Sequence, residues 1–274
     1  MNKTKIEWCD SSWNPVTGCY HSCEYCYARK MANRFDGGYV SGGKKRGNYC
    51  LSDKATRYII TPELNDGHIL MTQHNPIFEN IGILDKDDKK YAAYPFGFCP
   101  TIHRQRLYEP AQKKKHQNIF VCSMADLFGD WVPAEWIQEV FKACEAAPQH
   151  RYLFLTKNPN RIKKMYFDNL PLKHWYGQTV TGGNVFGMPM ANRSFISFEP
   201  LLSEVNISPL VYFGWAIIGA ETGTKGKTAP KKEWVKNIVD FCNGKNIPVF
   251  MKDSLIPIVG EENMIREFPW RNQI

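Results

Sequence analysis

The chain has 274 residues, of which 43% are hydrophobic and 14% aromatic, so its composition is that of a packed globule and excludes a disordered tail. No run of about 18 apolar residues occurs, and no apolar stretch follows the first lysines, so we expect neither a membrane-spanning helix nor a signal peptide. The net charge of +8 is compatible with nucleic acid or an anionic cofactor as a partner, although a solvated basic surface would carry the same charge.

Nine cysteines occur along the chain, and three of them, Cys19, Cys23 and Cys26, lie in one short stretch. The odd number of cysteines, their clustering and the missing signal peptide all argue against a disulfide framework. We therefore expect reduced thiols and a cytoplasmic protein, in which the cysteines of apolar runs are small core residues.

The N-terminal part of the chain has the order strand, loop, helix. Residues 8–17 predict the first strand and its entry, with the strand ending at Asn14-Pro15. The cysteine stretch forms a loop, and residues 24–35 have helical composition. This order is expected when a ligand-bearing loop lies at the carboxyl end of a barrel strand.

Residues 36–95 lose this regularity and contain many Gly, Asp and Lys. Short β-like pieces occur at Arg57–Thr61 and His68–Thr72. Because a structureless loop of that length is unusual in a compact domain, we expect an inserted lid or a small β subdomain with a hairpin.

From residue 96 onward, apolar strands alternate with amphipathic helices, which implies parallel strands with right-handed crossovers. We therefore predict an α/β fold built as a parallel (β/α) barrel, full or partial. Residues 1–35 supply its first strand, loop and helix, residues 36–95 the insertion, and residues 96–274 the remainder. A doubly wound open sheet is the alternative, although no GxGxxG sequence opens a helix. The expected strands are 96–102, 118–124, 151–157, 174–181, 193–199, 214–221 and 247–252, and the expected helices are 104–112 (a short helix or turn), 133–146, 159–165 and 231–242.

The cysteine stretch has the pattern Cys-x3-Cys-x2-Cys, with an aromatic residue, Tyr25, before the last cysteine. Thiolates hold iron–sulfur clusters, and three thiolates from one loop suit a cluster of four irons whose fourth iron stays open. A structural zinc site needs four closed ligands, and His21 alone lies near enough to be the fourth. A zinc or other metal knot, or unligated core cysteines, are therefore the alternatives.

This pattern resembles the signature of the radical S-adenosylmethionine (SAM) superfamily. In that superfamily the open iron of a four-iron four-sulfur cluster binds SAM, and the reduced cluster cleaves SAM to a 5′-deoxyadenosyl radical that abstracts hydrogen from a substrate. The resemblance implies that Cys19, Cys23 and Cys26 hold the cluster. It also implies that Tyr25 contacts the adenine and that an external donor supplies the electron.

Longer motifs are similar to an uncharacterised, phage-associated three-cysteine-motif family that is distantly like spore photoproduct lyase. The likeness covers residues 5–35 and 96–255, whereas residues 36–95 lie outside it. At residues 219–223 the chain has Gly-Ala-Glu-Thr-Gly in place of the more usual Gly-Gly-Glu-Ser-Gly, and Glu221 is kept. The shared motifs are KIEWCDSSWNP, SMADLF, LTKNP, SFEPLL, GAETG and PVFMK.

Polar side chains follow each apolar strand at its carboxyl end. In a parallel barrel these ends converge on one mouth, where sites are built, and buried charges are costly unless they are paired or solvated. A single charge would only end its strand at solvent, but several together predict a shared pocket. The residues are Ser123, Asp126, Thr156, Lys157, Gln178, Thr181, Ser197, Glu199, Glu221, Lys252 and Asp253.

Roles for these side chains follow from the charges of SAM. Lys157 can meet its carboxylate, and Glu199 can meet its ribose hydroxyls or its ammonium group. Glu221 and Lys252 either orient the substrate or form an ion pair across the mouth. His103 is expected at the surface, and the alternative is that it faces the site. The predicted cofactor-binding residues are Tyr25, Ser123, Lys157, Gln178 and Glu199, and the predicted catalytic residues are Lys157, Glu199, Glu221 and Lys252.

The distant lyase likeness and the basic charge favour a nucleobase, nucleotide or nucleic acid as the substrate, and a peptide or small metabolite is the rival. A different class of function is a non-catalytic, zinc-stabilised binding module on a barrel scaffold. That alternative predicts a chain that folds with zinc and forms no 5′-deoxyadenosine from SAM.

Overall fold

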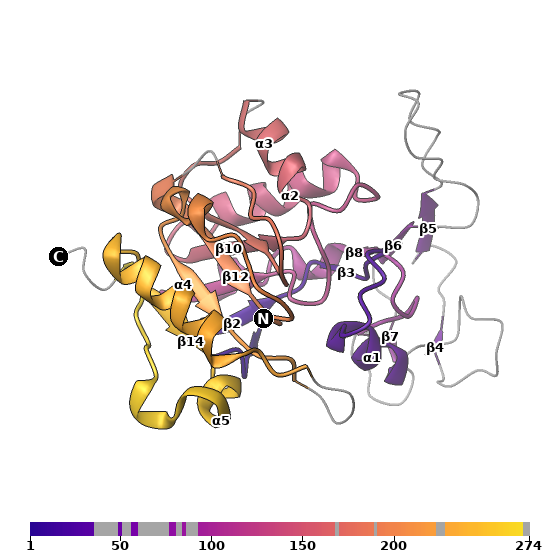
Figure 1. Ribbon diagram of the computed structural model, residues 1–274. Coiled ribbons are helices and arrows are strands. Elements are labelled where there is room, and N and C mark those ends of the chain that lie inside the picture. Colours follow the sequence, from indigo (N-terminus) through magenta and orange to yellow (C-terminus); the bar gives the residue numbers. More distant parts are fainter. Residues whose placement is uncertain are drawn as a thin grey trace. The chain divides into compact units, whose positions relative to one another are not determined.

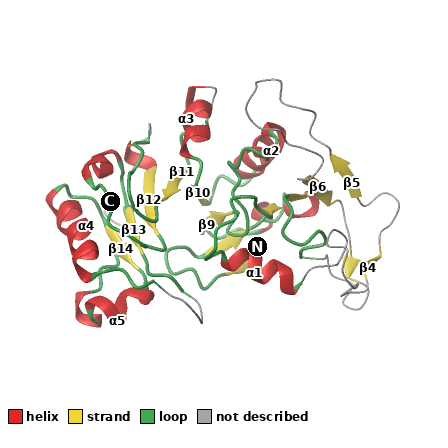
Figure 2. Cartoon of the chain, turned by 45° about the vertical axis from the view of Figure 1, so that its right-hand side comes forward, coloured by secondary structure: helices red, strands yellow, loops and turns green. Residues whose placement is uncertain are grey.

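The structure is a computed structural model that describes residues 1–35, 49–50, 56–59, 77–80, 84–85, 93–167, 170–188, 191–222 and 228–270. The chain forms two compact units: Met1–Thr4 with Cys9–Arg151, and Lys5–Trp8 with Tyr152–Ile274. Figure 1 labels the elements of both units, and Figure 2 colours them by type. Across the described residues, the helices are all too short or too polar to cross a membrane.

The first unit contains β-strands that lie in three separate groups. β2 (Ser11–Trp13) pairs antiparallel with β1 (Asn2–Lys3) and parallel with β9 (Asn118–Val121). A four-stranded sheet has the order β3-β8-β6-β5, and β4 pairs with β7. The bounds of these strands are β3 Val16–Thr17, β4 Tyr49–Cys50, β5 Thr56–Ile59, β6 Ile77–Asn80, β7 Leu84–Asp85 and β8 Thr101–His103.

The first strand, expected within residues 8–17 and ending at Asn14-Pro15, is β2, which stops at Trp13 as expected; the separate strand β3 that follows was not predicted. The break between the two strands falls at Asn14-Pro15. Proline has no N–H to donate to a strand ladder and therefore interrupts pairing. After the break the chain leaves the sheet of β2 and joins β8, where Val16 pairs with Ile102.

The prediction of a strand at residues 96–102 was wrong. Turns and a bend occupy most of this segment, and β8 begins only at Thr101. Gly97, with a φ of 59°, lies in the left-handed region, which does not fit a strand. His103, expected at the surface, is instead fully buried. Its Nε2 lies 2.8 Å from Thr17 Oγ1 and its Nδ1 lies 3.0 Å from Asn80 Nδ2, and burial holds its pKa well below the ordinary value.

The helices of the first unit each bury one face. α1 (Tyr27–Arg34) buries Ala28 and Ala32, which are one turn apart. α2 (Ala134–Glu145) begins after Pro133, which agrees with the helix expected at residues 133–146. Burying one large apolar side chain stabilises a fold by about 1.5–3 kcal/mol. The buried residues of α2 are Trp136, Ile137, Val140, Phe141 and Cys144.

The second unit contains five parallel strands in the order β10-β11-β12-β13-β14, with a helix after β10 and another after β13. In both views α4 and α5 lie beside β14 (Figures 1 and 2). The strands are β10 Arg151–Thr156, β11 Trp175–Thr179, β12 Ser194–Phe198, β13 Ala216–Ile218 and β14 Val249–Met251, and the helices are α3 Pro159–Phe167, α4 Lys232–Gly244 and α5 Ile256–Val259. Short 3-10 helices lie at Arg104–Arg106, Pro110–Gln112, Ala191–Arg193, Ser208–Tyr212, Asp253–Leu255 and Glu261–Asn263.

The core of the second unit includes a cluster of aromatic rings, and the segment Lys5–Trp8 packs against this cluster through Trp8. The ring centroid of Trp8 lies 6.0 Å from that of Phe195 on β12 and 6.2 Å from that of Trp215, which precedes β13. Trp8 is only 2% exposed. Aromatic pairs at this spacing stabilise a fold beyond the area that they bury, which explains why Lys5–Trp8 packs with residues far along the chain.

These observations confirm the predicted α/β class with parallel strands, and they are consistent with a partial (β/α) barrel. Closure into a barrel stays a prediction. Within the expected insertion, β5 overlaps the β-like piece at Arg57–Thr61 and pairs antiparallel with β6. The second piece, His68–Thr72, lies outside the described residues, and a separate lid or subdomain stays a prediction.

Candidate functional site

The cysteine loop connects β3 to α1 in the first unit, and its entry is fixed by backbone hydrogen bonds. Gly18 N–H donates to Met124 O at 2.9 Å, and Cys19 N–H donates to Phe98 O at 3.2 Å. Gly18 has a φ of 86°, and a Cβ there would lie 2.2 Å from Cys99 O. Because only glycine fits this conformation and this close approach, residue 18 determines how the loop begins.

The three cysteines of the loop form no disulfide and are partly buried. Two of the sulfurs accept backbone N–H groups: His21 N lies 3.5 Å from Cys19 Sγ, and Arg29 N lies 3.4 Å from Cys26 Sγ. Cys26 is also the residue that caps the N-terminus of α1. Among the described residues, no three His, Cys, Asp or Glu side chains are grouped so that they could hold a metal ion.

Tyr25 and Ser123, both predicted to contact the cofactor, lie in the same unit as the loop. The Tyr25 hydroxyl is hydrogen-bonded to Cys23, and burial, with a smaller effect of Cys23, raises the pKa of Tyr25. Ser123 Oγ donates to Asn14 Oδ1 at 3.2 Å, and its carbonyl oxygen accepts a 2.8 Å bond from the hydroxyl of Tyr27 at the start of α1. Tyr25 thus contacts one of the predicted ligands directly.

A pair that sequence reasoning missed links the loop to the turn after β9. His21 Nε2 lies 2.7 Å from Asp126 Oδ2, and the ring of His21 packs edge-on against Trp131 with centroids 4.8 Å apart. Both polar residues had been singled out, His21 as a possible zinc ligand and Asp126 as a strand-end residue. Their pairing had no signal in the sequence because 105 positions separate them.

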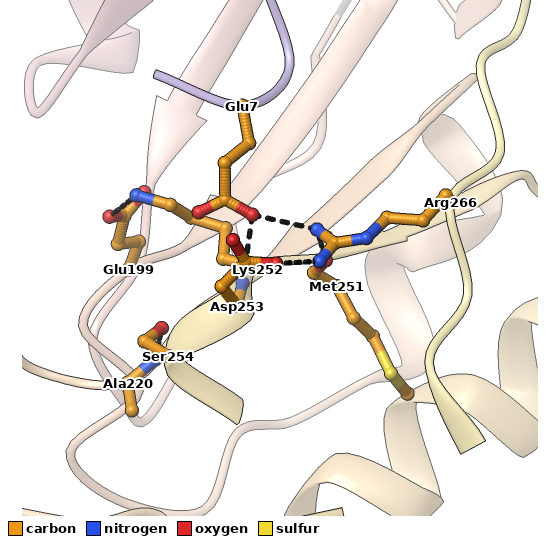
Figure 3. A network of polar contacts seen from close by, with 8 residues as sticks. All are labelled: Glu7, Glu199, Ala220, Met251, Lys252, Asp253, Ser254 and Arg266. Carbon is orange, nitrogen blue, oxygen red and sulfur yellow. Dashed lines mark hydrogen bonds and ion pairs between the residues drawn. The ribbon is translucent and has the colours of Figure 1, made fainter. Parts of the chain in front are cut away.

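In the second unit, the predicted residues Glu199 and Lys252 form an ion pair, drawn in Figure 3. Glu199 follows β12, Lys252 follows β14, and Gly219 lies between them after β13. A Cβ at Gly219 would lie 3.1 Å from Lys252 Cδ and 3.2 Å from Glu199 Cγ. The Lys252 side chain is 13% exposed and that of Glu199 26%, so the pair is partly withdrawn from water.

A second group of charges lies beside this pair in Figure 3. Arg266 Nη1 donates to Glu7 Oε2 at 2.8 Å, and the guanidinium also contacts the Asp253 carboxylate and the carbonyl oxygen of Met251. Asp253 N–H donates to the same Glu7 oxygen at 2.8 Å. Glu7 and Arg266 were not predicted, because an interaction across 259 positions leaves no local pattern.

Among the remaining strand-end residues, Thr156 and Gln178 are neighbours, because they are register partners in β10 and β11. Lys157 is exposed just after β10. Gln178 is buried in β11, where its Nε2 donates to Phe186 O at 2.7 Å. Glu221 accepts a 2.9 Å bond from the backbone N–H of Thr228. The shared pocket predicted for these residues therefore stays a prediction.

A cavity of about 180 Å³ does occur in the described part of the second unit. Its lining combines one carboxylate, two amides and an indole ring with aliphatic side chains, and it includes none of the predicted site residues. The lining residues are Glu204, Val205, Asn206, Ile207, Trp234 and Asn237.

The fold and the loop together define an α/β protein with three closely spaced cysteines, none in a disulfide, after a short N-terminal strand. The chain belongs to the family described as Protein of unknown function (DUF5131), whose model matches residues 3–65 and 84–255. These segments include the cysteine loop and all the strand-end residues, whereas residues 66–83, left unmatched, fall within the expected insertion. No curated protein and no solved structure matches the chain.

Proposed function

We propose that this chain is a radical SAM enzyme in which Cys19, Cys23 and Cys26 hold a four-iron four-sulfur cluster. The observation that carries the proposal is the cysteine loop itself, which offers three cysteines within eight residues, none of them in a disulfide. Two of their sulfurs already accept backbone N–H groups, as cluster-bound thiolates do. The residues therefore fit the cluster by number and type of donor, although the three sulfurs are not gathered around one point.

When bound, such a cluster supplies the electron that cleaves SAM. An external donor must first deliver that electron to the cluster. The chain's own residues would bind and orient the cofactor and keep water away from the radical. Tyr25 is the best-placed predicted contact, because its hydroxyl is hydrogen-bonded to Cys23. The proposal also includes cofactor contacts from four further residues and catalytic roles for four residues. The cofactor contacts are Ser123, Lys157, Gln178 and Glu199, and the catalytic residues are Lys157, Glu199, Glu221 and Lys252.

The reaction can be tested by anaerobic incubation of reconstituted protein with SAM and a chemical reductant. We expect 5′-deoxyadenosine from the wild type and none from Cys23→Ser, because loss of one ligand of three removes the cluster. Lys236→Ala, which changes an exposed residue of α4, is the matched control and should behave as the wild type. Equal product from wild type and Cys23→Ser would contradict the proposal.

The proposed substrate is a nucleotide or a nucleic acid, which the net charge of +8 supports. Binding of DNA or RNA through phosphates weakens steeply as salt rises, because counterions are released. Retention on immobilised DNA or RNA at low salt, lost at higher salt, is the expected result. No retention at low salt would favour a peptide or small metabolite.

A zinc-stabilised binding module is the second candidate, and the pairing of His21 with Asp126 favours it. Histidines that bind zinc commonly donate their other ring N–H to a carboxylate. In this alternative His21 would be the fourth ligand beside the three cysteines. It predicts about one zinc and no iron per chain as purified.

A further inference from the structure

The bond between His21 and Asp126 fastens the middle of the cysteine loop to the turn after β9. The imidazole of His21 is 22% exposed and the carboxylate of Asp126 only 7%, so the 2.7 Å contact is shielded from water. Hydrogen bonds in which one partner is ionised are about twice as strong as bonds between neutral groups. The contact is therefore strong enough to influence the position of the loop.

Asp126 is itself held in place, and so is the ring that it contacts. Asp126 Oδ1 accepts a 3.0 Å bond from the backbone N–H of Phe128, which fixes the carboxylate within its own turn. On the other side, Trp131 packs against His21 and also against Tyr20, with ring centroids 4.8 and 5.6 Å apart. The imidazole is thus fixed both by its polar partner and by its aromatic neighbour.

The backbone at this point of the loop needs such support. Ser22, the next residue, has a φ of 55°, in the left-handed region that is unfavourable for a residue other than glycine. The backbone N–H of His21 points at Cys19 Sγ, 3.5 Å away. The direction of this N–H depends on how the peptide unit before His21 is oriented.

We propose that Asp126 and His21 are positioning residues that hold the His21 N–H on the sulfur of Cys19. This inference rests on the proposed function, because the hydrogen bond would change the reduction potential and the iron retention of a cluster bound to that sulfur. A hydrogen bond to a ligand sulfur stabilises the negative charge that the cluster gains on reduction, and so raises its reduction potential. Groups that orient metal ligands also slow the loss of the metal.

The test compares His21→Phe with wild type after anaerobic reconstitution with iron and sulfide. Phenylalanine keeps a ring against Trp131 and removes the bond to Asp126. We expect iron to be lost to a chelator about 10-fold faster, because loss of such an orienting partner typically costs 10- to 100-fold in metal affinity. A redox titration followed by electron paramagnetic resonance (EPR) should give a more negative potential, a readout that a merely structural role would not move.

His116→Phe is the matched control, because His116 is an exposed histidine of the same unit, and its ring nitrogens contact the backbone carbonyl of Gln149 and the side chain of Arg151, away from the cysteine loop. It should retain iron and titrate as the wild type does. Asp126→Asn gives a second reading if His21→Phe does not fold. Asparagine keeps the side-chain size and an oxygen for Phe128 N–H, but replaces the carboxylate by a neutral amide. Faster iron loss and a lower potential are expected here too.

Wild-type iron retention and wild-type potential in a folded His21→Phe, or in Asp126→Asn, would overturn the inference while leaving the proposed function intact. A wild-type protein that takes up no iron–sulfur cluster would overturn the proposed function, and the inference with it. The two failures are therefore distinguishable within one set of samples.

Discussion

Lowering the pH from about 7.5 to about 5 should destabilise the folded chain through one buried histidine, His174, which precedes β11. Its side chain is enclosed by aromatic rings of the second unit and is 2% exposed. The ring centroids of Tyr152 and Phe154 lie 5.3 and 5.6 Å from that of His174. Burial, with smaller effects of Lys173 and Arg193, lowers the pKa of His174 to about 3.

The direction and size of the effect follow from this shift. An unfolded histidine takes up its proton near pH 6.5, whereas folded His174 does so only near pH 3. Above about pH 6.5 both states are neutral and the stability is fully present, and it is lost progressively as the pH falls toward 3. By about pH 5 the loss amounts to about 2 kcal/mol relative to about pH 7.5.

Urea unfolding at the two pH values, followed by tryptophan fluorescence, measures this loss. His174→Phe keeps a ring among its aromatic neighbours and cannot take up a proton. Its free energy of unfolding should therefore fall between the two pH values by about 2 kcal/mol less than that of the wild type. Other titrating groups, including buried His103, contribute to both proteins and cancel in the comparison.

Tyr176→Phe is the control from the same aromatic cluster. It removes a hydroxyl that donates to Pro171 O at 2.9 Å, which should cost about 1 kcal/mol at both pH values alike. The reasoning is refuted if His174→Phe and the wild type lose equal stability on acidification, since His174 would then titrate no differently in the folded and unfolded chain.

Three further predictions concern the site. Gly18→Ala forces a Cβ to within 2.2 Å of Cys99 O at a φ of 86°, so urea unfolding should show a loss of roughly 2–4 kcal/mol, and a loss under 1 kcal/mol would contradict this geometry. Glu199→Gln and Lys252→Met should each cost about 1–3 kcal/mol, whereas the double variant should cost less than their sum; strict additivity would show that the ion pair contributes nothing. SAM binding in the absence of substrate, measured by equilibrium dialysis of reconstituted protein, should weaken in Tyr25→Ala. The control Tyr108→Ala changes an exposed tyrosine and should bind SAM as the wild type does. Unchanged binding in Tyr25→Ala would show that Tyr25 does not contact the cofactor.

Local patterns predicted those parts of the fold that local physics decides. The run Asn118-Ile-Phe-Val121 is apolar enough to be recognised as a buried strand, and the apolar spacing of residues 133–146 predicted α2 almost to its ends. The strand expected at residues 96–102 failed because composition alone could not show the turn around Gly97. β6 was missed because four residues within an irregular stretch carry too little periodicity.

The polar contacts of the site depend on distant parts of the chain and were therefore only partly predicted. Glu199 and Lys252 were each recognised at a strand end, but the ion pair considered for Lys252 was with Glu221, whereas the structure pairs Lys252 with Glu199. In contrast, Glu7 contacts Arg266, which is 259 positions away in the sequence. No local sequence pattern predicts that residues 5–8 pack in the second unit. The sequence thus identified the residue types of the site more successfully than their partners.

The central claim is that Cys19, Cys23 and Cys26 hold a four-iron cluster with one iron open to SAM. The most direct measurement combines metal and sulfide analysis of the anaerobically reconstituted protein with EPR of its reduced form, recorded before and after SAM is added. The proposed function predicts about four irons and four sulfides per chain and a signal that changes when SAM binds. About one zinc with no iron, or a cluster signal that SAM leaves unchanged, would contradict it.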